Sequence, residues 1–162
     1  MSLKPTSSQT VGPFYHFGLL HDDLKRRAVH GASNEECRIS GRVVDGEGAP
    51  TADVFLEFWH PSSGFARISC DANGEFSVSL PRPAPDRKGG AAYFSVAIFG
   101  RGMLRHLYTR CYLAGDPALE HDAVLTGVPA ARRDTIIARA DGGRFRFDVV
   151  LQGGRETVFF DV

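Results

Sequence analysis

The segment 54–59 reads VFLEFW and decides the fold class. Its side chains are mostly apolar on both alternating faces, and three of its six residues are aromatic. Aromatic and β-branched side chains are enriched in strands, and a strand that is apolar on both faces is typically covered by protein on both sides. The segment therefore predicts a central β-strand.

Further strands are predicted on both sides of this segment by period-two alternation between turn signals. Residues 38–44 alternate apolar and polar before the tight-turn sequence DGEG at 45–48. The sequence DANG at 71–74 marks a second turn, and apolar residues at strand spacing follow it. The remaining predicted strands cover residues 76–80, 92–99, 105–113, 144–151 and 156–162.

Only residues 116–140 have a helical signature, because Asp116 and Pro117 supply an N-cap and a first-turn proline and Pro129 can open a second short helix. Residues 1–36 are irregular, with the aromatic cluster FYHF at 14–17, so we expect an arm that packs on its own core or on a partner. The pattern predicts an all-β chain, an antiparallel β-sandwich with a short late helical insertion. We expect a single domain over 1–162, with an extended arm at 1–36 and the core at 37–162.

The composition excludes several classes of function. Nineteen basic and nineteen acidic residues cancel, so no net charge steers the 162-residue chain toward nucleic acid or an anionic membrane. No apolar run is long enough to cross a bilayer, and the N-terminus lacks the apolar stretch of a signal peptide. The three cysteines form no C-x-x-C pair and read as free thiols, which predicts a reducing compartment, by default the cytoplasm.

Few motifs carry chemistry by themselves. His106 and Tyr108 share one face of a predicted strand and Tyr112 continues it, a set that would suit ferric iron. The same pattern also fits strand residues with polar tips at a surface, which is the commoner case. There is no nucleophile elbow, P-loop or dinucleotide-binding motif. From the residues alone, the chain reads only as a soluble β-sandwich.

Several longer segments together resemble one family, the intradiol ring-cleavage dioxygenases. SQTVGPF at 8–14 is similar to their N-terminal arm, and residues 41–59 are similar to their first core hairpin. The resemblance is closer still to the α subunits of the protocatechuate-cleaving members of the family. It covers nearly the whole chain in the right order and rests on FGRGML at 99–104, HLYTR at 106–110, RFRFD at 144–148 and ETVFFD at 156–161.

The resemblance implies a non-haem Fe(III) that is held by a partner β subunit through two Tyr and two His. Where the β subunit has its pair of histidines, this chain reads AYFSV at 92–96. Where the β subunit has its two tyrosines, this chain has Phe65 in one loop and no Tyr in the other, at 81–90. The implied reading is a non-metal-binding α subunit, inactive alone, with no metal ligand and no catalytic residue of its own.

The resemblance also implies a role in the partner's substrate pocket. Thr10, Gly12 and Pro13 of the arm and Arg101 of the core would line that pocket, where a β subunit cleaves protocatechuate with O2 to 3-carboxy-cis,cis-muconate. A plain turn at Gly12–Pro13 and a solvated Arg101 stay open as alternatives. So do a stand-alone transthyretin-like binding module and an autonomous metalloenzyme that would use Tyr93 with the His106 set. The aromatic arm further suggests that the lone chain self-associates.

Overall fold

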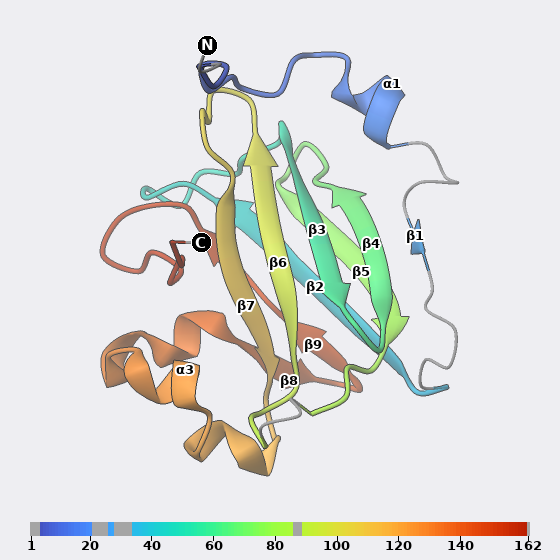
Figure 1. The fold of residues 1–162 in the computed structure, drawn as a ribbon, viewed down its shortest axis with the longest axis vertical. Helices are drawn as coiled ribbons and strands as arrows, with labels where there is room; N and C mark the ends of the chain where they lie inside the picture. Colours follow the sequence, from blue (N-terminus) through green and yellow to red (C-terminus); the bar gives the residue numbers. More distant parts are fainter. Residues whose placement is uncertain (1–3, 21–25, 28–33, 86–88, 162) are drawn as a thin grey trace.

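The computed structural model describes residues 4–20, 26–27, 34–85 and 89–161. Its ribbon consists mostly of strands, which confirms the all-β prediction (Figure 1). The strands are β1 (Arg26–Arg27), β2 (Glu36–Val44), β3 (Val54–His60), β4 (Gly64–Ser69), β5 (Glu75–Pro81), β6 (Tyr93–Gly100), β7 (Leu107–Leu113), β8 (Ile137–Asp141), β9 (Arg144–Arg146) and β10 (Val149–Val150). The helical segments are α1 (Tyr15–Leu19), η1 (Pro117–Glu120), α3 (Ala123–Gly127) and η2 (Ala130–Ile136).

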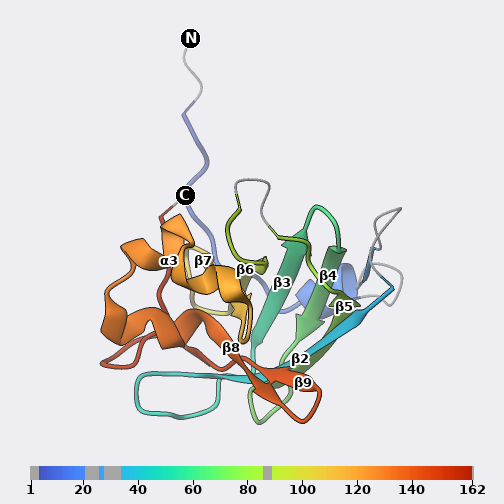
Figure 2. The ribbon, with the colours of Figure 1, turned by 90° about the horizontal axis from the view of Figure 1, so that it is seen from below.

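One hydrogen-bonded path joins the strands in the order β1-β4-β3-β6-β7-β8-β9-β2-β10, and β5 also pairs with β2. β3 lies between β4 and β6, so the predicted central position of the segment 54–59 is confirmed. Most pairs are antiparallel, but β7 with β8, and β2 with both β9 and β10, are parallel. The path curls so that β2, β5 and β9 lie behind β3 and β6, and α3 lies beside β7 (Figures 1 and 2).

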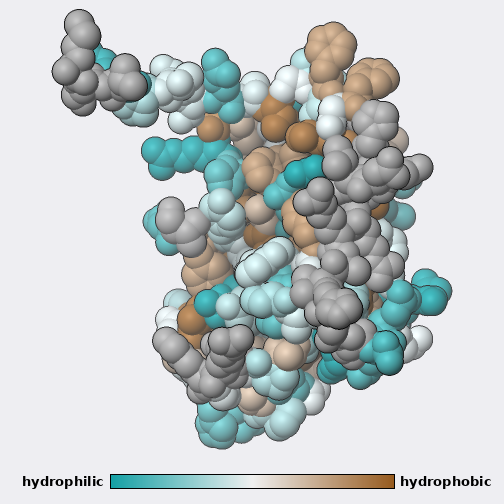
Figure 3. Space-filling model, turned by 45° about the vertical axis from the view of Figure 1, so that its right-hand side comes forward, coloured by the Kyte–Doolittle hydropathy of each residue, from teal (hydrophilic) through white to brown (hydrophobic). Residues whose placement is uncertain are grey.

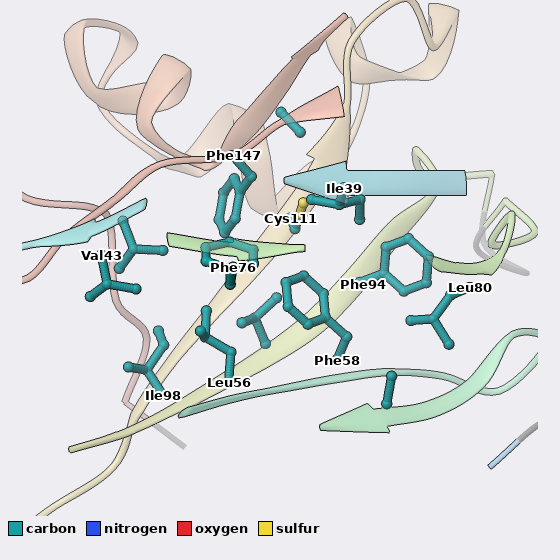
Figure 4. Packing of buried hydrophobic residues seen from close by; sticks show 14 of the residues in the cluster. Ile39, Val43, Leu56, Phe58, Phe76, Leu80, Phe94, Ile98, Cys111 and Phe147 are labelled. Carbon is teal, nitrogen blue, oxygen red and sulfur yellow. The ribbon is translucent and has the colours of Figure 1, made fainter. Parts of the chain in front are cut away.

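The main core fills the space that the curled sheet encloses. Leu56 and Phe58 of β3 point toward Ile39 of β2 and toward Phe147, and all four side chains are almost fully buried (Figure 4). A fully buried Leu or Phe side chain contributes about 1.5–3 kcal/mol to folding. The period-two alternation that predicted β2 therefore reports which of its two faces points inward.

Gly41 shows how closely the chain crosses itself in this core. A Cβ at residue 41 would lie 1.7 Å from the carbonyl oxygen of Phe147, because the segment after β9 passes directly over β2. The N–H of Phe147 donates a hydrogen bond to the carbonyl of Ser40 at 2.8 Å, which fixes this crossing. Any side chain at residue 41 would force the two segments apart.

The structure corrects three sequence-based expectations near the chain ends. Residues 15–19 form α1 and residues 26–27 form β1 inside the predicted arm 1–36, of which residues 1–3, 21–25 and 28–33 lie outside the described part. The predicted strand at 144–151 is split, because Phe147 and Asp148 leave the ladder between β9 and β10. Residues 156–161 form no strand, since their bonds go to separate segments, Thr157 to Val150 and Phe160 to Tyr108.

Three further differences lie in the core. The helical segment ends at Ile136, and β8 takes up residues that were predicted as helix. The strands before and after the turn at 45–48 do not form the hairpin that the resemblance suggested, because both edges of β2 are occupied by β5 on one side and by β9 and β10 on the other. β4 was not predicted. No helix among the described residues is long and apolar enough to cross a membrane.

Candidate functional site

The N-terminal arm meets the core at the turn between β6 and β7. The Thr10 hydroxyl donates a hydrogen bond to the carbonyl of Gly100 at 3.3 Å and accepts one from the N–H of Gly102 at 2.7 Å. These two glycines flank Arg101. The structure therefore brings Thr10 and Arg101, two predicted site residues from distant parts of the sequence, to the same end of the sheet (Figure 1).

Gly12 and Pro13 continue the arm as an exposed turn that leads into α1. The N–H of Tyr15 donates to the carbonyl of Gly12 at 3.3 Å. The backbone of Gly12 is outside the left-handed region, and no described heavy atom lies within 4 Å of the place where its Cβ would be. This chain's own fold thus leaves room for a side chain at residue 12.

The Arg101 side chain makes an ion pair at the surface. Its Nη1 lies 3.2 Å from Oδ2 of Asp53, and both side chains are 55% exposed. The backbone N–H of Arg101 donates to the carbonyl of Asp53 at 3.0 Å, so the turn itself is held in place independently of the side chain. Because an exposed ion pair contributes only about 0–1 kcal/mol, the guanidinium can turn from Asp53 to a ligand at little cost.

A groove of about 350 Å³ lies beside the junction of the arm and this turn. It is lined by Gln9, Thr10, Val11, Phe99, Gly100, Met103, Leu104, Arg105 and His106. Of the four predicted pocket residues, Thr10 lines this groove, whereas Gly12, Pro13 and Arg101 lie outside its lining. The structure therefore gathers the four residues around one end of the molecule without enclosing them in one cavity.

A stack of aromatic rings fixes α1 against the core. The ring centroids of Tyr15 and Phe55 are 5.3 Å apart, those of Phe55 and Phe99 are 4.7 Å apart, and those of Phe99 and His106 are 5.1 Å apart. Burial raises the pKa of the Tyr15 phenol and the charge of Asp53 raises it further, so this hydroxyl stays protonated at neutral pH. The stack holds the arm in position, and His106 is one of its packing residues.

Two aromatic side chains of the same helical turn stay in water. Phe14 is 76% exposed and Phe17 is 73% exposed, with ring centroids 6.4 Å apart. Leu104, in the turn after β6, is 61% exposed. Brown, apolar surface gathers at the upper end of Figure 3, the end at which Figure 1 shows α1. Exposed apolar side chains that gather in this way make this end of the molecule a candidate interaction surface.

The outer face of β6 and β7 holds a second set of polar and aromatic groups. Tyr93 and Ser95 lie on this face of β6, because Phe94 between them points into the main core. The Arg110 guanidinium of β7 lies 4.1 Å from the centroid of the Tyr93 ring, and its Nη1 donates to the Tyr112 hydroxyl at 3.0 Å. The strand that corresponds by resemblance to the iron-binding histidines thus carries a phenol covered by a cation.

Asp122, which is 3% exposed, completes this set from the N-terminus of α3. Its Oδ1 accepts hydrogen bonds from the Tyr112 hydroxyl at 2.8 Å and from the N–H groups of Val124 and Leu125, and its Oδ2 accepts from the N–H of Ala91. Burial raises the pKa of the Asp122 carboxyl, but these hydrogen bonds outweigh burial and lower it overall. Burial raises the pKa of Tyr112, so Asp122 is ionised and Tyr112 is neutral at pH 7.

Curated relatives match this chain over almost its full length. The protocatechuate 3,4-dioxygenase alpha chain of Burkholderia cepacia is 37% identical over 195 residues, which covers 99% of either chain. The alpha chain of the same name from Pseudomonas putida is 30% identical and covers 98% of this chain and 97% of its own length. The chain belongs to the protocatechuate 3,4-dioxygenase alpha-chain family. No protein-family model matches it.

The fold agrees with this family of intradiol dioxygenases. The dioxygenase domain of a dioxygenase carbohydrate-binding protein fusion from Streptomyces sp. SirexAA-E superposes with a TM-score of 0.61 at 22% identity. The superposition covers 93% of this chain and all of that one. The aligned region with the Burkholderia cepacia alpha chain spans 195 residues, whereas this chain has 162, so that relative carries segments that this chain lacks.

Intradiol dioxygenases are non-haem iron enzymes, and the described residues of this chain do not fit such a metal. Among the described residues, no group of three or more His, Cys, Asp or Glu could hold a metal ion. Of the tyrosines that could serve instead, Tyr93 is covered by the Arg110 cation and Tyr112 is hydrogen-bonded to Asp122. On this face of the sheet the Arg110 guanidinium thus contacts both phenols.

The alternative metal set predicted around His106 is not assembled either. His106 and Tyr108 touch ring to ring, with centroids 4.5 Å apart, but the Tyr112 hydroxyl is directed to Asp122. Sequence reasoning also missed Asp53 and Asp122. Asp122 has a readable signal, because it precedes a short helix in the same way as Asp116, but nothing local to Asp53 indicates a pairing with Arg101.

Proposed function

We propose that this chain is the alpha subunit of an αβ intradiol dioxygenase that cleaves protocatechuate with O2 to 3-carboxy-cis,cis-muconate. A beta chain holds Fe(III), which activates the bound catechol toward O2, while this chain shapes the substrate pocket and supports assembly. The near full-length identity to two alpha chains supports the class of enzyme. The junction between Thr10 and the turn that carries Arg101 supports this chain's part in it.

Each pocket residue has a defined part in this proposal. Thr10 fixes the arm to the core through two hydrogen bonds, and Pro13 stiffens the exposed turn that follows. Gly12, which the fold itself does not require to be glycine, lets the backbone approach a flat aromatic substrate closely. Arg101 turns from Asp53 toward the carboxylate or the catecholate charge of the substrate.

The proposed contact with the beta chain follows from the exposed aromatic side chains of the arm. The exposed rings of Phe14 and Phe17 form the surface that the beta chain covers, and in its absence they drive self-association of the lone chain.

We further propose that residues 1–162 form a single domain, with the curled sheet as a transthyretin-like sandwich. The three buried free cysteines fit a reducing compartment, which we take to be the cytoplasm.

Co-expression with the beta chain encoded in the same genome tests the proposal. We expect the two chains to co-purify, to contain iron, and to consume O2 when protocatechuate is added. A Phe14→Ser/Phe17→Ser double variant should weaken co-purification. The Arg155→Ser variant, which changes another exposed residue, should not. Failure to bind the beta chain, or a complex that is inert toward protocatechuate and other catechols, would contradict it.

A further inference from the structure

The exposed turn at Gly12 and Pro13 lies between two points at which the arm is attached to the core. Before the turn, the Thr10 hydroxyl makes its two hydrogen bonds to the turn between β6 and β7. After the turn, α1 begins, and its Tyr15 ring stacks on Phe55 of β3. Within the described chain, the only hydrogen bond of the turn itself goes to Tyr15, which also belongs to the arm. The position of the turn is therefore set by its two attachments.

The C-terminal end of α1 is attached to the sheet by an arginine. Because α1 has only five residues, its last carbonyl groups find no N–H partner within the helix. The carbonyl of Leu19 instead accepts a hydrogen bond from Nη1 of Arg67, on β4, at 3.1 Å. Arginine suits this position, since its N–H donors and its positive charge both match the carbonyl groups at a helix C-terminus. Arg67 thus joins α1 to a strand that is distant in the sequence.

The other contacts of Arg67 hold its guanidinium in place. Arg67 lies directly opposite Glu57 on the neighbouring strand β3, and its Nε and Nη2 both donate to Oε1 of Glu57. Its Cζ lies 5.2 Å from the centroid of the Phe65 ring and 5.9 Å from that of Phe55. The side chains of Arg67 and Glu57 are only 17% and 22% exposed, so water weakens this ion pair less than an exposed one. Because the guanidinium is already oriented, little side-chain freedom is lost when Nη1 binds α1.

We propose that Arg67 is a positioning residue for the substrate pocket. It clamps α1 to β4 and so holds Gly12 and Pro13 where the arm meets the beta chain. Its described contacts go to Leu19, to Glu57 and to two aromatic rings, so it acts on the pocket through α1 and not directly. The clamp rests on contacts within this chain, whereas its effect on the pocket rests on the proposed function.

Limited proteolysis of the lone chain with chymotrypsin tests the clamp. Cleavage after Phe14 or Phe17 requires α1 to detach and unfold, so its rate follows the population of the detached arm. Arg67→Lys keeps a charge beside Glu57 but lacks the planar fork that also reaches Leu19. Cleavage of the arm should therefore become about 10-fold faster, as for the loss of one charge-assisted hydrogen bond. Arg67→Met, which loses the charge as well, should accelerate it at least as much.

Two controls separate the clamp from general stability. Arg82→Met is the matched variant, because Arg82 also makes an ion pair with a glutamate and lies over the ring of Phe145, but it has no described contact with α1. It should leave cleavage of the arm unchanged. Cleavage after Tyr108, within β7, reports unfolding of the sheet. Parent-like cleavage of the arm in Arg67→Lys, or a rise no larger than that after Tyr108, would overturn the clamp.

Steady-state kinetics of the complex with the beta chain test the effect on the pocket. Because the arm is in place for a smaller fraction of the time, Arg67→Lys should raise the KM for protocatechuate about 3- to 10-fold. It should change kcat less than KM and leave the iron content as it is, whereas Arg82→Met should keep the parent values. A loosened arm with an unchanged KM would overturn the positioning role. A parent complex inert toward protocatechuate would overturn the proposed function and the positioning role with it, while proteolysis of the lone chain still decides the clamp.

Discussion

The arm end of the sheet and the outer face of β6 and β7 differ in whether their side chains find partners within the chain. At the arm end, Phe14 and Phe17 stay in water and Arg101 makes only an exposed ion pair. On the outer face, Tyr112 is fully buried and Asp122 accepts four hydrogen bonds from groups of its own chain. The fold leaves the aromatic rings of the arm end in water, whereas the Tyr112 hydroxyl and the Asp122 carboxylate find hydrogen-bond partners within the chain.

This difference separates two kinds of contribution to an enzyme. A region that the fold leaves unsatisfied gains most from a partner, because covering its apolar rings removes them from water. A region that satisfies its own charges gains little from a metal ion, which would have to displace the Arg110 guanidinium and its hydrogen bond to Tyr112. We therefore propose that the alpha chain contributes to the active enzyme through its arm end.

The largest expected effect comes from removing the buried carboxylate of Asp122. Asp122→Ala leaves the Tyr112 hydroxyl and three N–H groups without their acceptor, so we expect a loss of about 3–5 kcal/mol in the free energy of unfolding. Asp116→Ala, which removes an N-cap with two backbone bonds, is the matched control and should cost about 1 kcal/mol. Urea denaturation measures both. Equal losses would mean that the buried network carries no special weight.

Arg101 gives the next largest effect, seen in activity rather than in stability. In the complex with the beta chain, Arg101→Ala should lower kcat/KM by about 10- to 1000-fold, equal to about 1.4–4 kcal/mol, with iron content unchanged. Arg101→Lys should recover part of the loss, since it keeps the charge without the planar fork. Arg155→Ala, which breaks another exposed ion pair, is the control. An Arg101→Ala complex with unchanged kcat/KM would remove this residue from the pocket.

A smaller effect is expected where the arm joins the core. Thr10→Val keeps the shape of the side chain but loses the hydrogen bonds to Gly100 and Gly102, so the arm should detach more readily. We expect affinity for the beta chain to fall about 3- to 10-fold, as for the loss of about one hydrogen bond. Thr6→Val, at an exposed arm residue, is the control. Identical affinities in surface plasmon resonance would show that the junction does not position the arm.

The smallest expected effect is a difference in pH dependence. Because the pKa of Asp122 is lowered in the folded chain, its contribution to stability is present above the ordinary Asp pKa of about 3.9 and is lost as the pH falls through the lower folded value. Asp122→Asn cannot lose this contribution, so its unfolding free energy should fall less steeply with acidification than that of the parent chain. A curve for Asp122→Asn that runs parallel to that of the parent chain would contradict the lowered pKa.

Strands with a regular pattern could be predicted from the sequence, and irregular elements could not. The apolar run of β3 and the alternation of β2, β6 and β7 report burial directly. β4 escaped prediction because the turn-forming residues Pro61 to Ser63 precede it, Gly64 begins it and Arg67 interrupts its apolar residues. The prediction of a closing strand was wrong because residues 156–161 hydrogen-bond to two different segments and form no ladder. No local sequence pattern reveals this.

The residues of the candidate site were likewise predictable only in part. The resemblance supplied Thr10, Gly12, Pro13 and Arg101, and the fold brings them to one end of the molecule. The pairing of Arg101 with Asp53 could not be predicted, because it depends on the approach of the turn after β6 to the start of β3. The buried network at Tyr112 likewise depends on where α3 packs, and the sequence-based predictions did not include Asp122.

Iron content of the chain, alone and in complex, tests the central claim most directly. The chain is purified by itself and with its beta chain, both are incubated with iron and desalted, and iron per chain is measured together with the tyrosinate-to-iron absorption. The account predicts a colourless lone chain that retains no stoichiometric iron, and a coloured complex that retains iron and consumes O2 with protocatechuate. Stoichiometric iron with a tyrosinate band on the lone chain would contradict it.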